Sequence, residues 1–359
     1  MPYTYLPGPA LRRYCEKLFE SCGFPAGQSR DIVDVLLTAD YYGIESHGVQ
    51  RMIRYYEAVE EGSIDPAAGY EIVHSTPISA VIDAPRTMGQ VMGIIGMNMA
   101  IEMAKKSGIG MVCVRGSNHY GIAGYYTSMA AKEDLLGICM TNTEAIALPT
   151  GGRKAMIGTN PIALCMPADP TDFWYDAATT VVTRGKLEVY NKQGKTLPHG
   201  WAADDSGAPC ADPSRVLDCI IGKRGGGIFP VGGANEETGS HKGYGLGVIV
   251  ELFTAIFAGG TTSPHVSRSG NADTSFCFWA IDYGIFGDKA DIRARMSELL
   301  DELRDSPKAE GSERIYTHGE KELEYAAMVA RQGVAVNEKT IAELKMIGGK
   351  LGVDFDGSF

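Results

Sequence analysis

Helix-like patterns at both ends of the chain enclose a middle of short strand-like runs, and this order constrains the fold more than any other feature. Residues 8–62 carry apolar side chains at helical spacing, and so do stretches near the C-terminus. From about residue 70 the pattern changes to short apolar runs. The order predicts a mixed α+β fold, with a helical domain built from residues 1–70 and 286–359 and a central mixed α/β domain of residues 71–285.

Cap residues and small residues place several elements more closely. Ser29 is an expected helix cap and Gly43 an expected helix stop, and a second helix is expected from Ser46 to Gly62. The stretch 184–240 is rich in turn residues and reads as loops. The strand candidates are AVIDAPRT, GMVCVRG, LLGICMTNT, IALCMPA and CFWAIDY. The other helix candidates are VMGIIGMNMAIEMAKKSG, packed tightly on a sheet, HKGYGLGVIVELFTAIFAGG, long and buried, and the amphipathic DIRARMSELLDELRDS and NEKTIAELKMIGGKLG.

Composition excludes several classes of protein. The net charge of −11 argues against broad affinity for nucleic acid or for an anionic membrane. No apolar run reaches the roughly 18 residues of a membrane span, and the N-terminus lacks the pattern of a secretory signal. The eight cysteines form no Cys-x-x-Cys pair, so neither a zinc ribbon nor a redox dithiol is expected. Scattered thiols of this kind are typical of a reducing cytoplasm.

Ser46, His47 and Arg51 form the first group of side chains that could take part in catalysis or binding. A histidine in the first helical turn faces the positive end of the macrodipole, which favours the neutral imidazole that accepts a proton. Arg51 follows one turn later on the same face, where a guanidinium can hold a substrate carboxylate. The competing interpretation is that Ser46 caps a helix while His47 and Arg51 are ordinary surface groups.

A glycine-punctuated turn follows the strand candidate GMVCVRG. Gly116, Gly121 and Gly124 resemble a phosphate-binding loop, but their spacing is not Gly-x-Gly-x-x-Gly. His119 lies in this turn, and a structural role explains this histidine as well as a functional role does. Glu144, at the end of the next strand, has a position in the sequence similar to that of the acidic residue that binds a ribose in Rossmann domains.

Two further stretches carry polar groups at suggestive positions. Asp176 lies among apolar and small residues and needs a partner if it is buried, a histidine being the natural one. The hydroxyls of Thr179 and Thr180 suit a ribose or a phosphate. His241 and Lys242 precede a long helix, where an anion is favoured. The alternatives are a turn aspartate without a role and a capped helix with a solvated lysine.

Seven motifs, taken in this order along the chain, resemble the malate/L-lactate dehydrogenase family, which is distinct from the Rossmann dehydrogenases. This family also contains ureidoglycolate, sulfolactate and diketogulonate oxidoreductases and piperideine-carboxylate reductases. The motifs are SHGVQR, VRGSNHYGIAGYY, PTGG with IGTNPIA, DAATT with its GK, LPHGWAADDSGAP, HKGYGLGVIVEL and THGEKE. The chain departs from the family pattern at Thr150, where relatives have tryptophan, and at His318, where they have proline.

The resemblance implies a homodimeric, NAD(P)-dependent oxidoreductase with a non-Rossmann nucleotide site. It implies that His47 donates and accepts a proton, that Ser46 and Asp176 orient it, that Arg51 holds the substrate carboxylate, and that His119 lines the substrate site. NAD is the expected cofactor, with NADP possible, and no metal is expected. The cofactor contacts that it implies are Asp176, Ala177, Ala178, Thr179, Thr180, His241, Lys242, His318, Gly319 and Glu320.

The expected reaction interconverts a 2-hydroxy acid and a 2-keto acid, with malate or lactate as the default substrate. A same-family reductase acting on a cyclic imine, or an enzyme acting on a ureido or sulfonate acid, remains an alternative. A dimeric binding protein without catalysis is a second alternative. A metal enzyme using His47, His119 and Asp176 is a weaker third, because their spacing matches no established ligand motif.

Overall fold

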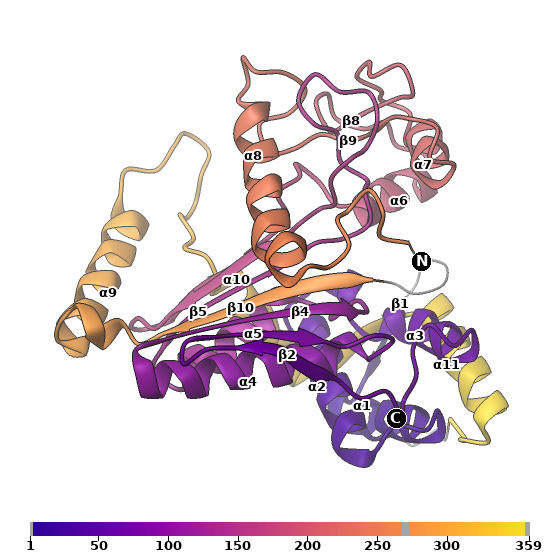
Figure 1. Cartoon of the computed structure of the whole chain (residues 1–359). Helices are drawn as coiled ribbons and strands as arrows, with labels where there is room; N and C mark the ends of the chain where they lie inside the picture. Colours follow the sequence, from indigo (N-terminus) through magenta and orange to yellow (C-terminus); the bar gives the residue numbers. More distant parts are fainter. Residues whose placement is uncertain (1–2, 268–272, 356–359) are drawn as a thin grey trace.

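The computed structural model describes residues 3–267 and 273–355. The first two residues of the predicted segment 1–70 and the last four of the predicted segment 286–359 therefore lie outside the described residues. A seven-stranded sheet forms the centre of the molecule, in the order β2-β3-β4-β10-β5-β6-β7 (Figure 1). The strands are β2 Glu71–Ser75, β3 Ser79–Asp83, β4 Ile109–Ser117, β5 Leu136–Thr141, β6 Ile162–Met166, β7 Phe173–Ala177 and β10 Thr274–Ile281.

The pairing of these strands differs from that of a Rossmann domain. Only β3 and β4 run parallel within this sheet, whereas the other neighbours are antiparallel. β10 comes from far along the chain and lies between β4 and β5. A doubly wound Rossmann sheet is mostly parallel, with a helical crossover after each strand. The mixed α+β fold expected from the sequence is thus confirmed, and the five strand candidates are all strands.

Helix α4 (Gly89–Ser107) covers one face of the sheet beside α5 (Ala123–Lys132). Its glycines allow a close approach: a Cβ at Gly93 would lie 2.5 Å from the ring of Tyr126, and one at Gly96 would lie 2.7 Å from the ring of Phe278. The expectation of tight packing on a sheet is confirmed. Alanine at either position would force these buried rings to move.

The two ends of the chain build one helical body below the sheet in Figure 1. A single hydrophobic cluster joins Leu11 and Leu36 from the N-terminal part to Val336 and Leu344 from the C-terminal part. Strands β1 (Tyr3–Leu6) and β11 (Val334–Asn337) pair antiparallel and tie the ends together. The helices are α1 Gly8–Ser21, α2 Ala26–Tyr41, α3 Met52–Glu60, α10 Glu320–Gln332 and α11 Glu338–Leu351. The exact domain boundaries remain a prediction.

One predicted cap is wrong. Helix α2 begins at Ala26 behind Pro25, whose φ of −57° is already close to that of a helix. Ser29 is buried inside the first turns and caps nothing. The predicted stop is confirmed, since α2 ends at Tyr41 and Gly43 has a positive φ of 73°.

A smaller lobe lies on the other face of the sheet (Figure 1). It contains α6 (Arg184–Lys192) and α7 (Pro213–Ile221), so the segment 184–240 is less loop-rich than its composition suggests. The short strands β8 (Ala202–Ala203) and β9 (Gly227–Ile228) pair within it. Asp212 caps α7 by accepting hydrogen bonds from the Ser214 and Arg215 amides.

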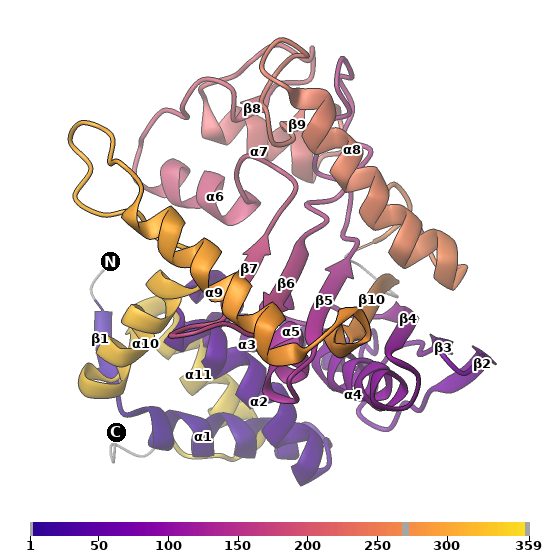
Figure 2. The ribbon, with the colours of Figure 1, turned by 90° about the vertical axis from the view of Figure 1, so that its left-hand side faces the viewer.

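Helix α8 (Ser240–Glu251) continues through a π-helical turn (Leu252–Ile256) and runs along the outside of the smaller lobe (Figure 2). The prediction that this apolar helix is buried is wrong within the single chain. Leu246, Ile249, Leu252 and Ile256 are each at least 40% exposed. Glycines Gly243 and Gly247 form its inner face, so the large side chains point outwards. No helix in the described part of the chain is long and apolar enough to cross a membrane.

Helix α9 (Lys289–Asp305) contacts the start of α10 through the ion pair between Arg304 and Glu320. A short 3₁₀ turn (Tyr283–Phe286) links it to β10. Figure 2 shows α9 crossing the molecule in front of the sheet. Arg293 and Ser297 on α9 contact the side chain and the amide of Asp169, respectively, in the loop after β6. This helix therefore belongs to the central body as much as to the helical one.

Candidate active site

The segment around His47 forms two short 3₁₀ turns instead of the predicted helix. The turns span Glu45–His47 and Val49–Arg51, and α3 begins only at Met52. Asp40 at the end of α2 explains the break, because its Oδ2 accepts a hydrogen bond from the Val49 amide at 2.9 Å. A Cβ at Gly48 would collide with the same carboxyl group, so only glycine fits there. His47 is therefore not in the first turn of an α-helix, and the macrodipole argument for its charge state does not apply.

His47 is nevertheless held in its neutral form. Burial, together with the positive charges of Arg51 and Arg54, lowers the pKa of His47 to about 3. The Ser46 hydroxyl lies 2.9 Å from Nδ1 of the imidazole. The neutral ring can accept a proton from a bound alcohol at neutral pH.

His119 lies against His47 from the loop that follows β4. The two imidazole rings stack with centroids 5.3 Å apart and an angle of 28° between planes. The Gly121 amide donates to Nδ1 of His119 at 3.4 Å, and the hydroxyl of buried Tyr55 lies 2.7 Å from the same nitrogen. An amide can only donate, so Nδ1 is an acceptor and the neutral ring carries its proton on Nε2.

Four of the predicted residues meet at one cavity of about 170 Å³. Ser46, His47, Arg51 and His119 all line it, from segments that are far apart in the sequence. Arg51 donates through Nε to the Ser46 carbonyl at 2.5 Å, which ties the guanidinium to the His47 turn. The sequence interpretation of these residues as one group agrees with their placement, although their individual roles remain predictions.

Several residues that line this cavity were missed by sequence reasoning. They include Arg54, Arg184, Glu188, Asn142, Thr143 and Thr159. The position of Arg54, three residues after Arg51, was a usable signal, since side chains at that spacing lie side by side. Arg184 gave no such signal, because it comes from α6 in the other lobe.

Asp176 lies at the end of β7 and points to a helix start instead of a histidine. Its Oδ2 accepts a hydrogen bond from the Gly124 amide at 2.7 Å, in the first turn of α5. Burial raises the pKa of Asp176 to about 6, while hydrogen bonds from the Gly124 and Ala123 amides oppose the rise. Within residues 3–267 and 273–355 no hydrogen bond joins Asp176 to His47. The orienting role of Asp176 toward His47 remains a prediction.

The predicted cofactor residues after Asp176 lie beside α8. Thr179 donates to the Thr159 carbonyl at 3.1 Å, and Thr180 donates to the Val182 carbonyl at 2.8 Å. Both threonines border a small cavity of about 10 Å³, together with Gly243 and Gly247 of α8. His241 and Lys242 are exposed in the first turn of the same helix. The stretch from Ala177 to Thr180 and the start of α8 are thus brought together, and Thr179 is hydrogen-bonded to Thr159, which lines the His47 cavity.

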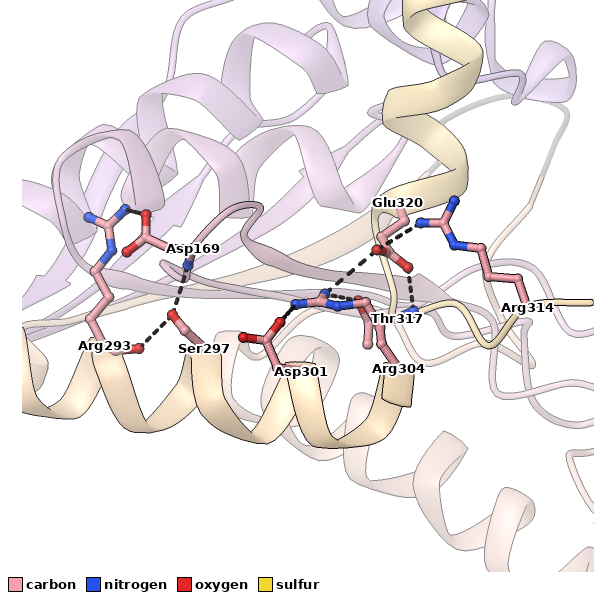
Figure 3. A network of polar contacts seen from close by, with 8 residues as sticks. All are labelled: Asp169, Arg293, Ser297, Asp301, Arg304, Arg314, Thr317 and Glu320. Atoms are coloured by element: carbon pink, nitrogen blue, oxygen red, sulfur yellow. Dashed lines mark hydrogen bonds and ion pairs between the residues drawn. The ribbon is translucent and has the colours of Figure 1, made fainter. Parts of the chain in front are cut away.

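His318, Gly319 and Glu320 lie at the start of α10, on the far side of β7 from α8. The carboxylate of Glu320 accepts from the Thr317 amide at 2.8 Å and pairs with Arg314 at 3.1 Å and Arg304 at 3.6 Å (Figure 3). Gly319 has a φ of 101° and forms the helix cap. These contacts give Glu320 a structural function between α9 and α10, and a cofactor contact at this position remains a prediction.

Glu144 borders the His47 cavity and two larger ones, of about 480 and 420 Å³. Its carboxylate lies 3.5 Å from the Lys223 ammonium group. The larger of the two shares His119 and Arg54 with the His47 cavity. Within the described ranges, no group of three or more histidine, cysteine, aspartate or glutamate side chains is placed to hold a metal ion.

Comparison with known proteins places the chain in a family. A profile described as malate/L-lactate dehydrogenase matches residues 7–345. The malate dehydrogenase of Pyrococcus abyssi is 39% identical over 98% of this chain and 96% of its own length. The L-sulfolactate dehydrogenase of Methanocaldococcus jannaschii is 37% identical over 93% of both chains.

Solved structures agree over the whole length. The malate dehydrogenase from Entamoeba histolytica superimposes with a TM-score of 0.95 at 34% identity, covering 99% of both chains. The malate dehydrogenase from Pyrococcus horikoshii OT3 gives 0.90 at 35% identity, covering 98% of this chain and 97% of its own. The chain therefore belongs to the malate/L-lactate dehydrogenase family of oxidoreductases.

Proposed function

We propose that the protein interconverts a 2-hydroxy acid and a 2-keto acid with a nicotinamide cofactor. The observation that carries the proposal is the neutral His47 in one cavity with the guanidinium of Arg51. A proton acceptor and a carboxylate-binding cation are the two groups that hydride transfer from a 2-hydroxy acid requires of the protein. Family membership supports the same reaction class.

The described residues fit a dinucleotide beside the His47 cavity. The adjoining cavity of about 420 Å³ lies within the size range of cofactor sites. Glu144 borders both this cavity and the His47 cavity, and a carboxylate suits ribose hydroxyls. Lys154 and Lys223 offer positive charge to phosphates in the same cavity. A bound nicotinamide supplies the hydride chemistry, and we propose NAD as the cofactor, with NADP as the alternative.

In the proposed mechanism, Arg51 binds the substrate carboxylate and places the hydroxyl group beside His47. The imidazole accepts the hydroxyl proton as the C2–H bond breaks, and the Ser46 hydroxyl 2.9 Å from Nδ1 restrains the ring. The substrate carboxylate offsets the positive charge of Arg51, which raises the pKa of His47 and favours the imidazolium that forms. In the reverse direction His47 returns this proton to the keto oxygen.

Two single variants test the assignment. His47→Ala removes the proposed proton acceptor, so kcat should fall by about 100-fold or more while cofactor affinity stays within a factor of two or so. His119→Ala should raise KM for the acid more than it lowers kcat. Near-normal turnover in His47→Ala would overturn the assignment, and a loss confined to His119→Ala would move the proton transfer to His119.

We propose a homodimer in which α8 packs against a second copy. The support is the outward apolar face of Leu246, Ile249, Leu252 and Ile256, together with Phe257 at 49% exposure. Exposed apolar surface of this extent on one helix is typical of an interface.

We also propose a cytoplasmic location, which the eight free cysteines support because such thiols persist in reducing compartments.

A further inference from the structure

Two guanidinium groups in the His47 cavity have no carboxylate of the described residues within ion-pair distance. The described charged residues that line the cavity are Arg51, Arg54, Arg184, Glu144 and Glu188. Glu188 accepts a hydrogen bond from Arg184 at 2.9 Å, and Glu144 lies 3.5 Å from the Lys223 ammonium group. Across the described ranges, neither Arg51 nor Arg54 has a carboxylate within 4.0 Å. The carboxylates of the cavity are therefore already paired, and two positive charges are left over.

Without a bound anion, the positive charges of Arg51 and Arg54 raise the free energy of the folded protein. Both side chains are half-buried, and each of the two guanidinium groups raises the free energy of the other. The Nε–H of Arg51 is used on the Ser46 carbonyl, which leaves its terminal nitrogens to bind a ligand. Because the whole chain carries a net charge of −11, this local excess is not a consequence of a basic composition. A bound dianion removes the cost at both residues.

The position of Arg54 decides which part of a substrate it meets. Arg54 borders the His47 cavity and also the larger cavity of about 480 Å³, which Arg51 does not border. It follows Arg51 by three residues, so the two side chains lie side by side. A substrate whose carboxylate is held at Arg51 thus extends its far end toward Arg54.

We propose that Arg54 binds a second anionic group, carried on C3 of the substrate, and so selects dianionic acids over lactate-like monoanions. This inference rests on the proposed function, with Arg51 holding the carboxylate at C1. The second group is a carboxylate or a sulfonate, since a guanidinium donates two parallel hydrogen bonds to either. Arg54 is then the residue that determines specificity within the reaction.

The test measures ligand binding in a complex that cannot turn over. Racemic malate, 3-sulfolactate and 2-hydroxybutyrate are titrated calorimetrically into enzyme saturated with NADH, and separately with NADPH. No hydride passes from a hydroxy acid to a reduced nicotinamide, so affinity is read without catalysis. 2-Hydroxybutyrate has the carbon skeleton of malate with a methyl group in place of the second carboxylate. The variants are Arg54→Gln, Arg51→Gln and the exposed control Arg30→Gln.

We expect wild type and Arg30→Gln to bind one of the dianions about 100-fold more tightly than 2-hydroxybutyrate. Arg54→Gln should remove this preference, whereas Arg51→Gln should weaken all three acids. Tighter binding of malate or of 3-sulfolactate identifies the second group as a carboxylate or a sulfonate. A preference that survives Arg54→Gln, or no binding of any acid by wild type, overturns the inference. Failure of the proposed function appears separately, as absent turnover of 2-keto acids by an enzyme that keeps the Arg54-dependent preference.

Discussion

Asp40 is a buried carboxyl group beneath the His47 turn, and its ionisation should control stability between pH 6.5 and 8. Its side chain is only 6% exposed and accepts the Val49 amide. Burial, aided by the charge of Glu45, raises the pKa of Asp40 from 3.8 to about 8, although the Val49 amide opposes the rise. At neutral pH this group is protonated in the folded protein and ionised in the unfolded chain.

The direction and size of the effect follow from this difference in proton binding. Between pH 3.8 and 8 the folded state holds one proton more than the unfolded state, so the free energy of unfolding falls as pH rises. The slope is at most about 1.4 kcal/mol per pH unit, or about 2 kcal/mol over the interval from pH 6.5 to 8. The imidazole of His47, whose pKa is lowered from 6.5 to about 3, is still half protonated in the unfolded chain at pH 6.5, so it opposes the slope at the lower end of this interval. Asp176, with its pKa raised to about 6, acts mainly below the interval.

Asp40→Asn should abolish that slope, because the amide oxygen still accepts the Val49 N–H and carries no charge at any pH. The assay is urea denaturation of wild type and Asp40→Asn at several values of pH from 6.5 to 8.5. The exposed variant Asp218→Asn is the matched control and should keep the wild-type slope. A wild-type stability that does not depend on pH in this interval, or an equal slope in Asp40→Asn, would contradict the assignment of this slope to Asp40.

Three further predictions address the site, the interface and the α9–α10 junction. Tyr55→Phe removes the hydroxyl 2.7 Å from Nδ1 of His119, and steady-state kinetics should show kcat/KM lower by about tenfold, an unchanged value arguing against a positioning role. Ile249→Glu should convert a dimer into a monomer in sedimentation velocity, whereas Met346→Glu on α11 should not; a monomeric wild type would contradict the proposed interface. Glu320→Gln should lower the free energy of unfolding by about 2 kcal/mol, because Arg304 and Arg314 lose their shared carboxylate. Parallel NADH titrations of that variant test the predicted cofactor contact, and unchanged stability would contradict the structural role.

Local patterns predicted the elements of the fold well, where local forces decide them. The glycines of α4 indicated close packing, and the structure places Gly93 and Gly96 against aromatic rings. The insertion of β10 between β4 and β5 could not be read, because strand pairing over such a distance leaves no local signal. The exposed face of α8 was also missed, since an apolar helix has the same sequence whether its own chain or another one covers it.

The residues of the candidate site were predicted better than their local backbone structure and the causes of their charge states. Ser46, His47, Arg51 and His119 do share a cavity. The helix expected at His47 was wrong because a long-range contact from Asp40 overrides local helix propensity. The neutral state of His47 follows from burial and neighbouring arginines, which no single segment of sequence encodes. For the same reason the sequence could not show that Asp176 binds the start of α5.

The most direct test of the proposed reaction is nicotinamide absorbance during reaction of the purified protein with a panel of 2-keto acids. NADH and NADPH are offered separately, with pyruvate, 2-oxobutyrate, oxaloacetate and 3-sulfopyruvate as substrates. We expect rapid cofactor oxidation that depends on a 2-keto acid and is fastest with oxaloacetate or 3-sulfopyruvate. Absence of oxidation with every keto acid, while NADH still binds, would contradict the 2-hydroxy acid assignment and favour a reductase acting on an imine or a ureido acid.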